Sequence, residues 1–216
     1  MNIIFGSASG IGNSLYQTYK SNKQDVYGID ALESEATDFV FNLENVENIK
    51  EIVKQTNDYK IQSITFCVAN QNQNYNVSNI FNTNVLSFLE FLNEVSSNLN
   101  NCVISAISSV HAVSSNPSNL YYASSKAALE SGIKNFAIRK SNNAYYVVRL
   151  GATDTKKLRQ NVGSIDSITS ILPSGKIFDE AEVSNFIYTL NSNFKNLLNG
   201  AIIQIDNGVL SMLKTD

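Results

Sequence analysis

Tyr122 and Lys126 are the residues whose types and spacing most clearly suggest chemistry. They lie four positions apart in the run 122–126, Tyr-Ala-Ser-Ser-Lys, within an expected helix, Ala123–Lys140. In a helix this spacing puts both side chains on one face, one turn apart. Because an ammonium group beside a phenol favours the phenolate, we expect Lys126 to lower the pKa of Tyr122 from its ordinary value of about 10. Such a tyrosine could act as a general acid/base. A solvated lysine on an amphipathic helix would give the same spacing, so the pair needs support from other motifs.

A glycine-rich turn near the start of the chain gives the first support. Gly6, Gly10 and Gly12 follow an expected strand, Asn2–Phe5, and open an expected helix, Ile11–Lys20. Glycines let the backbone turn tightly and approach a pyrophosphate, and the free N–H groups at a helix start attract its negative charge. This placement favours a dinucleotide-binding turn over a plain strand-to-helix connection.

Asp30 bears on the identity of the dinucleotide. It follows the second expected strand, Asp25–Ile29, eighteen residues after Gly12. A carboxylate at about this distance can accept hydrogen bonds from the adenosine ribose and would repel a 2′-phosphate. Ser9 and Ala31, the residues best placed to hold such a phosphate, are not basic. The sequence therefore favours NAD, with NADP as the alternative, unless Asp30 merely caps a loop.

Composition argues against several functional classes. The chain has 216 residues, a net charge of -3 and a pI near 5.2, which argues against nucleic acid or an anionic membrane as the main partner. It contains no apolar run of about 18 residues and no secretory signal pattern, so we expect a cytoplasmic protein. Cys67 and Cys102 fall in apolar runs and are expected to be buried, reduced thiols. No second candidate ligand lies near His111, the single histidine, so no metal site is expected; His111 is either an ordinary loop residue or part of a substrate pocket.

Short apolar runs alternate with helical patterns along the whole chain. The expected strands are Asn2–Phe5, Asp25–Ile29, Phe39–Asn42, Ile61–Val68, Cys102–Ser108, Ala144–Leu150 and Ala201–Ile205. The expected helices are Ile11–Lys20, Val46–Gln55, Val85–Ser97, Ala123–Lys140 and Glu180–Leu190. This alternation predicts an α/β fold, a doubly wound parallel sheet of about seven strands with helices on both faces. No linker divides residues 1–216, so a single domain is expected, and the polar segment Lys156–Ile177 is interpreted as a loop or lid.

Taken together, these motifs resemble the short-chain dehydrogenase/reductase superfamily over nearly the whole chain. The glycines reproduce its Gly-x-x-x-Gly-x-Gly pattern, and Tyr122 and Lys126 its Tyr-x-x-x-Lys. Ser109 stands thirteen residues before Tyr122, where that family has its catalytic serine. Asn84 matches its structural asparagine, and the segment 199–208 resembles its last strand.

The resemblance implies a Rossmann-type fold and an NAD(P)-dependent oxidoreductase that interconverts a secondary alcohol and a ketone or aldehyde by hydride transfer. Tyr122 would be the general acid/base, Ser109 would bond the same oxygen, Lys126 would hold the nicotinamide ribose, and Asn84 would seat a water that links Lys126 to solvent. A small-molecule substrate and a homodimer or homotetramer are also implied. The cofactor-binding residues implied are Gly6, Ser7, Ser9, Gly10, Ile11, Gly12, Asp30, Asn42, Leu43, Ala69, Asn70, Tyr122, Lys126, Gly151, Thr153 and Thr155.

Four positions depart from the family's pattern. Phe5 replaces a frequent threonine, Asn42 an aspartate, Leu150 a proline, and the stretch 67–70, Cys-Val-Ala-Asn, lacks a glycine. None of these changes removes a proton-transfer group, so they bear on cofactor affinity more than on catalysis.

Two other functions are compatible with parts of the pattern. A non-catalytic nucleotide sensor or scaffold could keep the fold, but it would not need Ser109, Tyr122 and Lys126 together. A nucleotide-sugar epimerase or dehydratase also uses Tyr-x-x-x-Lys, but those proteins usually have a different glycine spacing and a long C-terminal substrate domain, for which we expect no room here.

Overall fold

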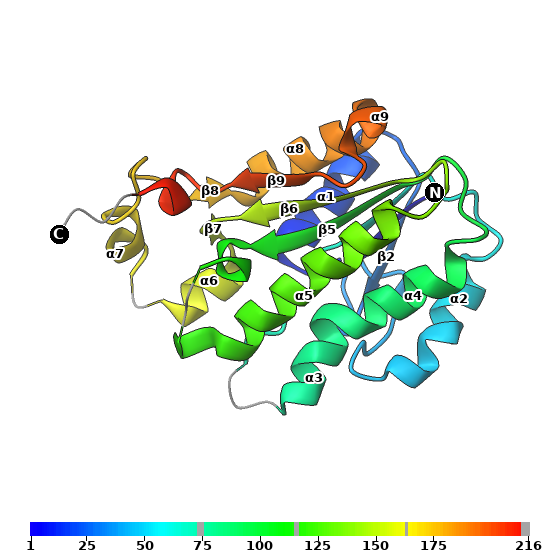
Figure 1. Cartoon of the computed structure of the whole chain (residues 1–216), viewed down its shortest axis with the longest axis horizontal. Helices are drawn as coiled ribbons and strands as arrows, with labels where there is room; N and C mark the ends of the chain where they lie inside the picture. Colours follow the sequence, from blue (N-terminus) through cyan, green and yellow to red (C-terminus); the bar gives the residue numbers. More distant parts are fainter. Residues whose placement is uncertain (73–75, 115–116, 163, 213–216) are drawn as a thin grey trace.

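A seven-stranded parallel sheet forms the centre of a single domain (Figure 1). The computed structural model describes residues 1–72, 76–114, 117–162 and 164–212. The strands of the sheet are β1 (Asn2–Phe5), β2 (Val26–Asp30), β3 (Phe39–Val40), β4 (Ser63–Phe66), β5 (Val103–Ser109), β6 (Ala144–Leu150) and β9 (Ile202–Ile205). Their order is β3-β2-β1-β4-β5-β6-β9, and every neighbouring pair is parallel. The predicted doubly wound, Rossmann-type α/β fold is therefore confirmed.

Helices cover both faces of this sheet. They are α1 (Gly10–Ser21), α2 (Ile49–Thr56), α3 (Val77–Phe81), α4 (Ser87–Val95), α5 (Leu120–Ala137), α6 (Lys156–Asn161), α7 (Ile165–Thr169), α8 (Glu180–Asn193) and α9 (Lys195–Leu198). One buried cluster joins the sheet to α2, α4 and α5, and a second joins it to α1 and α8. The central strands β1, β4 and β5 are buried along their whole length because helices cover both sides of the sheet. No helix in the described part of the chain is long and apolar enough to cross a membrane.

Phe5, the first departure from the family's pattern, belongs to the core. Its ring is buried and lies 5.6 Å from Phe88 and 5.0 Å from Phe91, edge-on to both. Phe66 stacks on Phe88 with 4.4 Å between ring centroids. Aromatic pairs at these separations add to the free energy of burial. The large residue at position 5 therefore anchors α4 against β1 and β4.

The helical segment before β5 begins earlier than predicted. The sequence predicts a helix over Val85–Ser97, whereas the structure has α3, one π-helical turn at Asn82–Leu86, and then α4. Within the missed part, Val77, Ile80 and Phe81 do recur at helical spacing, but residues 82–84, Asn-Thr-Asn, interrupt the apolar pattern before Val85. A π turn inserts an extra residue into a helix and is frequent at functional sites. In this protein the π turn contains Asn84 and sets the position of its side chain.

The segment Lys156–Ile177 is more ordered than a loop. Its described part contains α6 and α7, which are capped by the side chains of Thr155 and Ser164. Two short parallel strands, β7 (Thr153–Asp154) and β8 (Phe178–Asp179), pair at its base and join its two ends. Figure 1 shows α6 and the start of α5 at the end of the sheet to which the strand arrows point. The segment therefore lies over the carboxyl edge of the sheet, as a lid would, although it is partly helical.

Both cysteines are free thiols. Burial raises the pKa of Cys67 and of Cys102 to about 12, so both stay protonated at neutral pH. Cys102 is buried as predicted, and Cys67 is half-buried.

The contact between Gly12 and Gly6 gives a stability prediction. A Cβ atom on Gly12 would lie 1.9 Å from the carbonyl oxygen of Gly6, which is backbone and cannot move aside. We expect Gly12→Ala to lower the free energy of unfolding by about 1–3 kcal/mol, as overpacking does. Urea unfolding of the wild type and the variant measures this loss of stability. Gly132→Ala in α5 is the matched control, because its Cβ would meet only the flexible side chain of Leu89. Equal losses in the two variants would contradict the prediction.

Candidate active site

Ser109 and Tyr122 meet at the carboxyl edge of the sheet. Ser109 is the last residue of β5, and Tyr122 lies in the first turn of α5. The hydroxyl of buried Tyr122 interacts with the side chains of Ser109 and Gln71, and both interactions act to lower its pKa. The Ser109 hydroxyl oxygen also accepts a hydrogen bond from the backbone N–H of His111, at 3.2 Å. A hydroxyl pair of this kind could bind a single oxygen atom of a ligand from two sides.

Lys126 lies one turn beyond Tyr122 and is buried. Its Nζ donates hydrogen bonds to the carbonyl oxygens of Val68, at 3.0 Å, and Ile107, at 2.9 Å. Val68 lies just after β4 and Ile107 lies in β5, so the lysine joins two neighbouring strands at their carboxyl ends. The Nζ atom stands 5.9 Å from the centre of the Tyr122 ring.

Burial sets the charge state of this pair. It raises the pKa of Tyr122, and the interactions with Ser109 and Gln71 only partly offset that effect. Burial also lowers the pKa of Lys126 to about 7, with a smaller contribution from the positive charge of Lys157. The predicted direction for the pKa of Tyr122 is therefore wrong, because desolvation of the phenolate raises it and Lys126 is not among the groups that lower it. Near neutral pH, Tyr122 is protonated and Lys126 can gain or lose a proton.

Asn84 holds the loop that follows β4. Its side-chain oxygen accepts a hydrogen bond from the backbone N–H of Asn70 at 2.5 Å, and its Nδ2 donates to the Asn70 carbonyl at 2.9 Å. The same Nδ2 donates to the Ser125 hydroxyl at 2.9 Å, and Ser125 donates to the Tyr122 carbonyl at 2.7 Å. A chain of hydrogen bonds thus links this loop to α5. The water-seating role of Asn84 stays a prediction.

The glycine turn is closed by Asp30. Gly6 has a φ of +85°, a conformation that side-chain-bearing residues rarely adopt. One oxygen of Asp30 accepts from the backbone N–H of Ala8 at 3.0 Å, and the other accepts from Leu32 N–H at 3.0 Å. Asp30 therefore caps its own loop and also fixes the turn after β1. Ser7 is buried under this turn, and Ser9 and Ile11 begin α1 beside it.

A surface pocket of about 730 Å³ opens beside the turn. Its lining residues come from both ends of the chain: Ala8, Ser9, Gly10, Asn13, Asp154, Lys156, Arg159, Gln160 and Glu180. Arg159 is paired with Asp154, whose carboxylate oxygen lies 2.6 Å from the guanidinium nitrogen. Backbone N–H groups at the start of α1 and the cations of α6 suit a phosphate group. The residues present therefore fit the pyrophosphate of a dinucleotide.

The remaining predicted cofactor residues follow the same edge of the sheet. Asn42 is exposed and accepts a hydrogen bond from Glu44 N–H at 2.9 Å, whereas the Leu43 side chain is in the core. The carbonyl of Ala69 accepts a hydrogen bond from the side chain of Lys157. Asn70 is fixed as described above.

Beyond β6, three predicted residues lie close together. Gly151 packs against Asp206, since a Cβ on it would lie 2.9 Å from the Asp206 Cα. The Thr153 hydroxyl donates to the Gly151 carbonyl at 3.4 Å, and the Thr155 hydroxyl accepts from Leu158 N–H at 3.0 Å. The backbone of this turn is therefore held by hydrogen bonds from side chains of the turn itself.

Sequence reasoning missed three members of the site. Gln71 contacts the Tyr122 hydroxyl, Lys157 reaches back to Ala69, and Ser125 joins Asn84 to α5. Ser125 could have been noticed inside the Tyr-x-x-x-Lys run. For Gln71 and Lys157 the sequence offers no signal, because their partners are far away along the chain.

His111 lies beside Tyr122. Its ring centre is 6.3 Å from that of Tyr122, with the rings nearly perpendicular, and burial lowers its pKa. The described residues contain no group of three or more histidine, cysteine, aspartate or glutamate side chains that could hold a metal ion.

Fold and site are those of a doubly wound α/β protein with a serine, a tyrosine and a lysine gathered at the carboxyl edge of its sheet. The family model described as enoyl-(acyl carrier protein) reductase matches residues 12–210. The chain belongs to this family, within the short-chain dehydrogenase/reductase superfamily. A search of curated protein sequences gave no significant match.

Solved structures of similar fold cover almost the whole chain. A short chain dehydrogenase family protein from Francisella tularensis subsp. tularensis SCHU S4 has a TM-score of 0.86 at 20% identity, covering 98% of each chain. The 4-hydroxyisoleucine dehydrogenase complexed with NADH has a TM-score of 0.85 at 19% identity, covering 99% of this chain and 100% of its own. ElxO with NADP bound has a TM-score of 0.80 at 21% identity, covering 98% and 99%. At such identities the likeness establishes the fold.

The buried lysine gives a pH-dependent stability prediction. The pKa of Lys126 is about 7 in the folded chain, below its unfolded value of about 10.4. Between those values the unfolded chain binds more protons, so stability rises with pH; below about pH 7 both states are protonated and the effect is constant. The variant Lys126→Met has no amine at this position and so lacks this pH-dependent contribution to stability. We therefore expect the unfolding free energy of the wild type, minus that of Lys126→Met, to rise from about pH 7 towards pH 10.

Urea unfolding across this pH range checks the expectation. Lys134→Met, on the exposed face of the same helix, controls for the loss of a lysine from α5. A difference between wild type and Lys126→Met that stays flat with pH would show that Lys126 titrates normally.

Proposed function

We propose that this protein is an NAD(P)-dependent oxidoreductase that interconverts a secondary alcohol and a ketone or aldehyde. The observation that carries the proposal is the buried Tyr122 side chain, which interacts with Ser109 at the end of β5 and lies one helical turn from Lys126. Family membership supports it, since solved proteins of this fold include a dehydrogenase complexed with NADH and ElxO with NADP bound. We further propose that residues 1–216 form one NAD(P)-binding domain, which works as a homodimer or homotetramer.

The proposed mechanism assigns proton transfer to Tyr122. In reduction its hydroxyl donates a proton to the carbonyl oxygen, and in oxidation its phenolate accepts the proton of the alcohol. Ser109 donates a hydrogen bond to the same oxygen and fixes its position. A bound nicotinamide cofactor would supply the hydride in reduction and accept it in oxidation. Because burial raises the pKa of Tyr122, the phenol is protonated at neutral pH, the state that reduction needs.

Lys126 returns protons to Tyr122 in this proposal. Its pKa of about 7 lets it gain or lose a proton near neutral pH, and its Nζ lies on the Tyr122 side of α5. An ammonium held between two carbonyls could also bind the ribose hydroxyls of the cofactor. Asn84 would seat a water that connects Lys126 to solvent.

The cofactor is proposed to lie across the carboxyl edge of the sheet. The glycine turn and the start of α1 would hold its pyrophosphate, with Lys156 and Arg159 of α6 facing them across the pocket. Asp30 would accept hydrogen bonds from the adenosine ribose, which favours NAD over NADP.

Replacing the proposed acid/base tests the mechanism directly. We expect Tyr122→Phe to lower kcat by at least about 100-fold, because proton transfer is lost, while cofactor binding stays close to that of the wild type. Steady-state kinetics and a thermal-shift titration with NAD measure the two effects. Tyr59→Phe, an exposed tyrosine far from Ser109 in the sequence, is the control and should be fully active. Substantial residual activity in Tyr122→Phe would rule out the assignment.

Cofactor choice gives a separate prediction. A ligand that binds the folded protein stabilises it by RT ln(1 + [L]/Kd), so at equal concentration the tighter ligand raises the melting temperature more. At equal concentrations we expect NAD to stabilise the protein more than NADP, because the Asp30 carboxylate repels a 2′-phosphate. Asp30→Asn keeps a side chain of similar shape without the charge, and it should reduce the difference between the melting-temperature shifts with NAD and with NADP. A larger shift with NADP for the wild type would contradict the role given to Asp30.

A further inference from the structure

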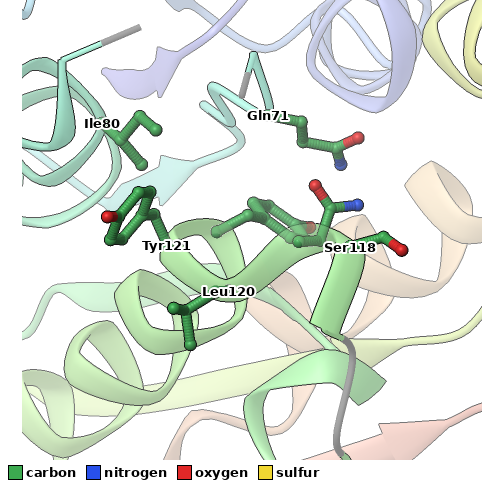
Figure 2. A pocket seen from close by; sticks show the side chains of 7 residues that line it. Gln71, Ile80, Ser118, Leu120 and Tyr121 are labelled. Carbon is green, nitrogen blue, oxygen red and sulfur yellow. The ribbon is translucent and has the colours of Figure 1, made fainter. Parts of the chain in front are cut away.

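A second pocket adjoins Tyr122 on the side of α3. It has a volume of about 270 Å³ (Figure 2). The described residues that line it are Gln71, Ile80, Ser118, Asn119, Leu120, Tyr121 and Tyr122. Ligand pockets for drug-sized molecules usually measure about 300–1,000 Å³. This one therefore suits a small molecule or a small part of a larger one.

Gln71 connects the pocket to the reaction centre. Its side chain lines the pocket and interacts with the Tyr122 hydroxyl. The residue before it, Asn70, is held at both backbone groups by the buried amide of Asn84. Gln71 thus projects from a fixed point of the loop. A molecule whose oxygen reached Tyr122 and Ser109 would have its neighbouring atoms next to this pocket.

The pocket wall is polar and carries no formal charge among its described residues. Gln71 and Asn119 contribute amides, each with donors and an acceptor, and Ser118 and Tyr121 contribute hydroxyls. The nearest described cations of the site, Lys126 and Lys157, donate to backbone carbonyls and do not line the pocket. A charged ligand would lose its hydration here without gaining an ionic partner. A ligand with hydroxyl or amide groups could exchange its hydrogen bonds to water for hydrogen bonds to these side chains.

Apolar surface is limited to the floor and the rim. Ile80 is 2% exposed and closes the floor, whereas Tyr121 and Leu120 are 46% and 60% exposed and form the rim. Figure 2 shows Ile80 and Gln71 on one side and Tyr121 and Ser118, from the start of α5 and the turn before it, on the other. A long acyl chain would need a continuous apolar channel, and this wall offers two aliphatic side chains. The flat ring of Tyr121 suits the C–H face of a compact polar molecule.

On the basis of the proposed function, we infer that this pocket binds the non-reacting part of the substrate. The substrate is a small, uncharged alcohol or carbonyl compound that carries several further hydroxyl or amide groups. Gln71 is the residue that determines this specificity, because it lines the pocket and also interacts with the Tyr122 hydroxyl. In oxidation one carbon–hydrogen bond gives its hydride to the nicotinamide and the hydroxyl proton passes to Tyr122, so the remaining hydroxyls are only bound.

A substrate panel tests the inference. Polyols and aldoses such as xylitol and D-xylose are compared with 2-octanol, lactate and crotonyl-coenzyme A, with NAD(H) and NADP(H), by absorbance of the reduced nicotinamide. We expect kcat/KM for the best neutral polyhydroxy compound to exceed that for each other probe by about tenfold or more. Turnover of 2-octanol, lactate or the enoyl thioester at a similar or higher rate would overturn the inference and leave the oxidoreductase function standing. If no probe were turned over although the cofactor binds, both the inference and the proposed oxidoreductase function would be contradicted.

Variants of Gln71 test the pocket itself. Gln71→Met keeps the length of the side chain and removes its hydrogen bonds, so KM for the polyhydroxy substrate should rise about tenfold. The ratio of kcat/KM for this substrate to that for 2-octanol should fall. Asn119→Leu, a change at another polar residue of the same pocket, should lower the same ratio. Gln55→Met, the same chemical change on an exposed face of α2, is the control.

The outcomes separate a binding role from a purely structural one. A lower kcat with both probes affected equally would mean that Gln71 only holds Tyr122, and the inference would be overturned. An unchanged ratio in both pocket variants would also overturn it. Thermal melts and NAD titrations of each variant confirm that the fold and the cofactor site are intact before the ratios are compared.

Discussion

The double hydrogen bond between the Asn84 side chain and the backbone of Asn70 holds the site together. It fixes the loop after β4 against the π turn before α4, and through Ser125 it fixes the start of α5 as well. The buried amide has its donor and its acceptor satisfied by backbone groups that would otherwise need partners of their own. Without it, the loop that carries Gln71 would have no fixed position relative to Tyr122.

Lys126 adds a second connection at the same edge. Its Nζ bridges the carbonyls of Val68 and Ile107, so the ends of β4 and β5 are joined by a side chain beyond the last ladder hydrogen bonds. Burial makes the charged form of both Lys126 and Tyr122 costly, and the two pKa values move towards a neutral pair. In the proposed mechanism, a proton that passes from Tyr122 to Lys126 would turn this neutral pair into an ion pair, whose opposite charges partly offset the cost of burial. The desolvation that contradicts the simple phenol–ammonium argument also brings the pKa of Lys126 to about 7, where the lysine can gain or lose a proton.

Much of the fold could be predicted because it depends on local patterns. Strands Asn2–Phe5 and Ala144–Leu150 match β1 and β6 residue for residue, since both are mostly apolar runs, rich in β-branched and aromatic residues, between polar segments. β3 ends at Val40, two residues early, because Asn42 turns the chain by accepting from Glu44 N–H. The π turn and α6 were missed because their polar sequences have no periodicity. Predicting the contacts of Gln71 and Lys157 would require knowing the tertiary packing first.

The departures from the family's pattern can be explained by packing. Phe5 fills the space between β1, Phe88 and Phe91, where a smaller residue would leave a cavity. Asn70 stands where the family has glycine, and its side chain accepts a hydrogen bond from Asn72 N–H at 3.0 Å. That contact shapes the loop on either side of Gln71. In the proposed function the loop at Asn70 therefore belongs both to the cofactor site and, through Gln71, to the wall of the proposed substrate pocket.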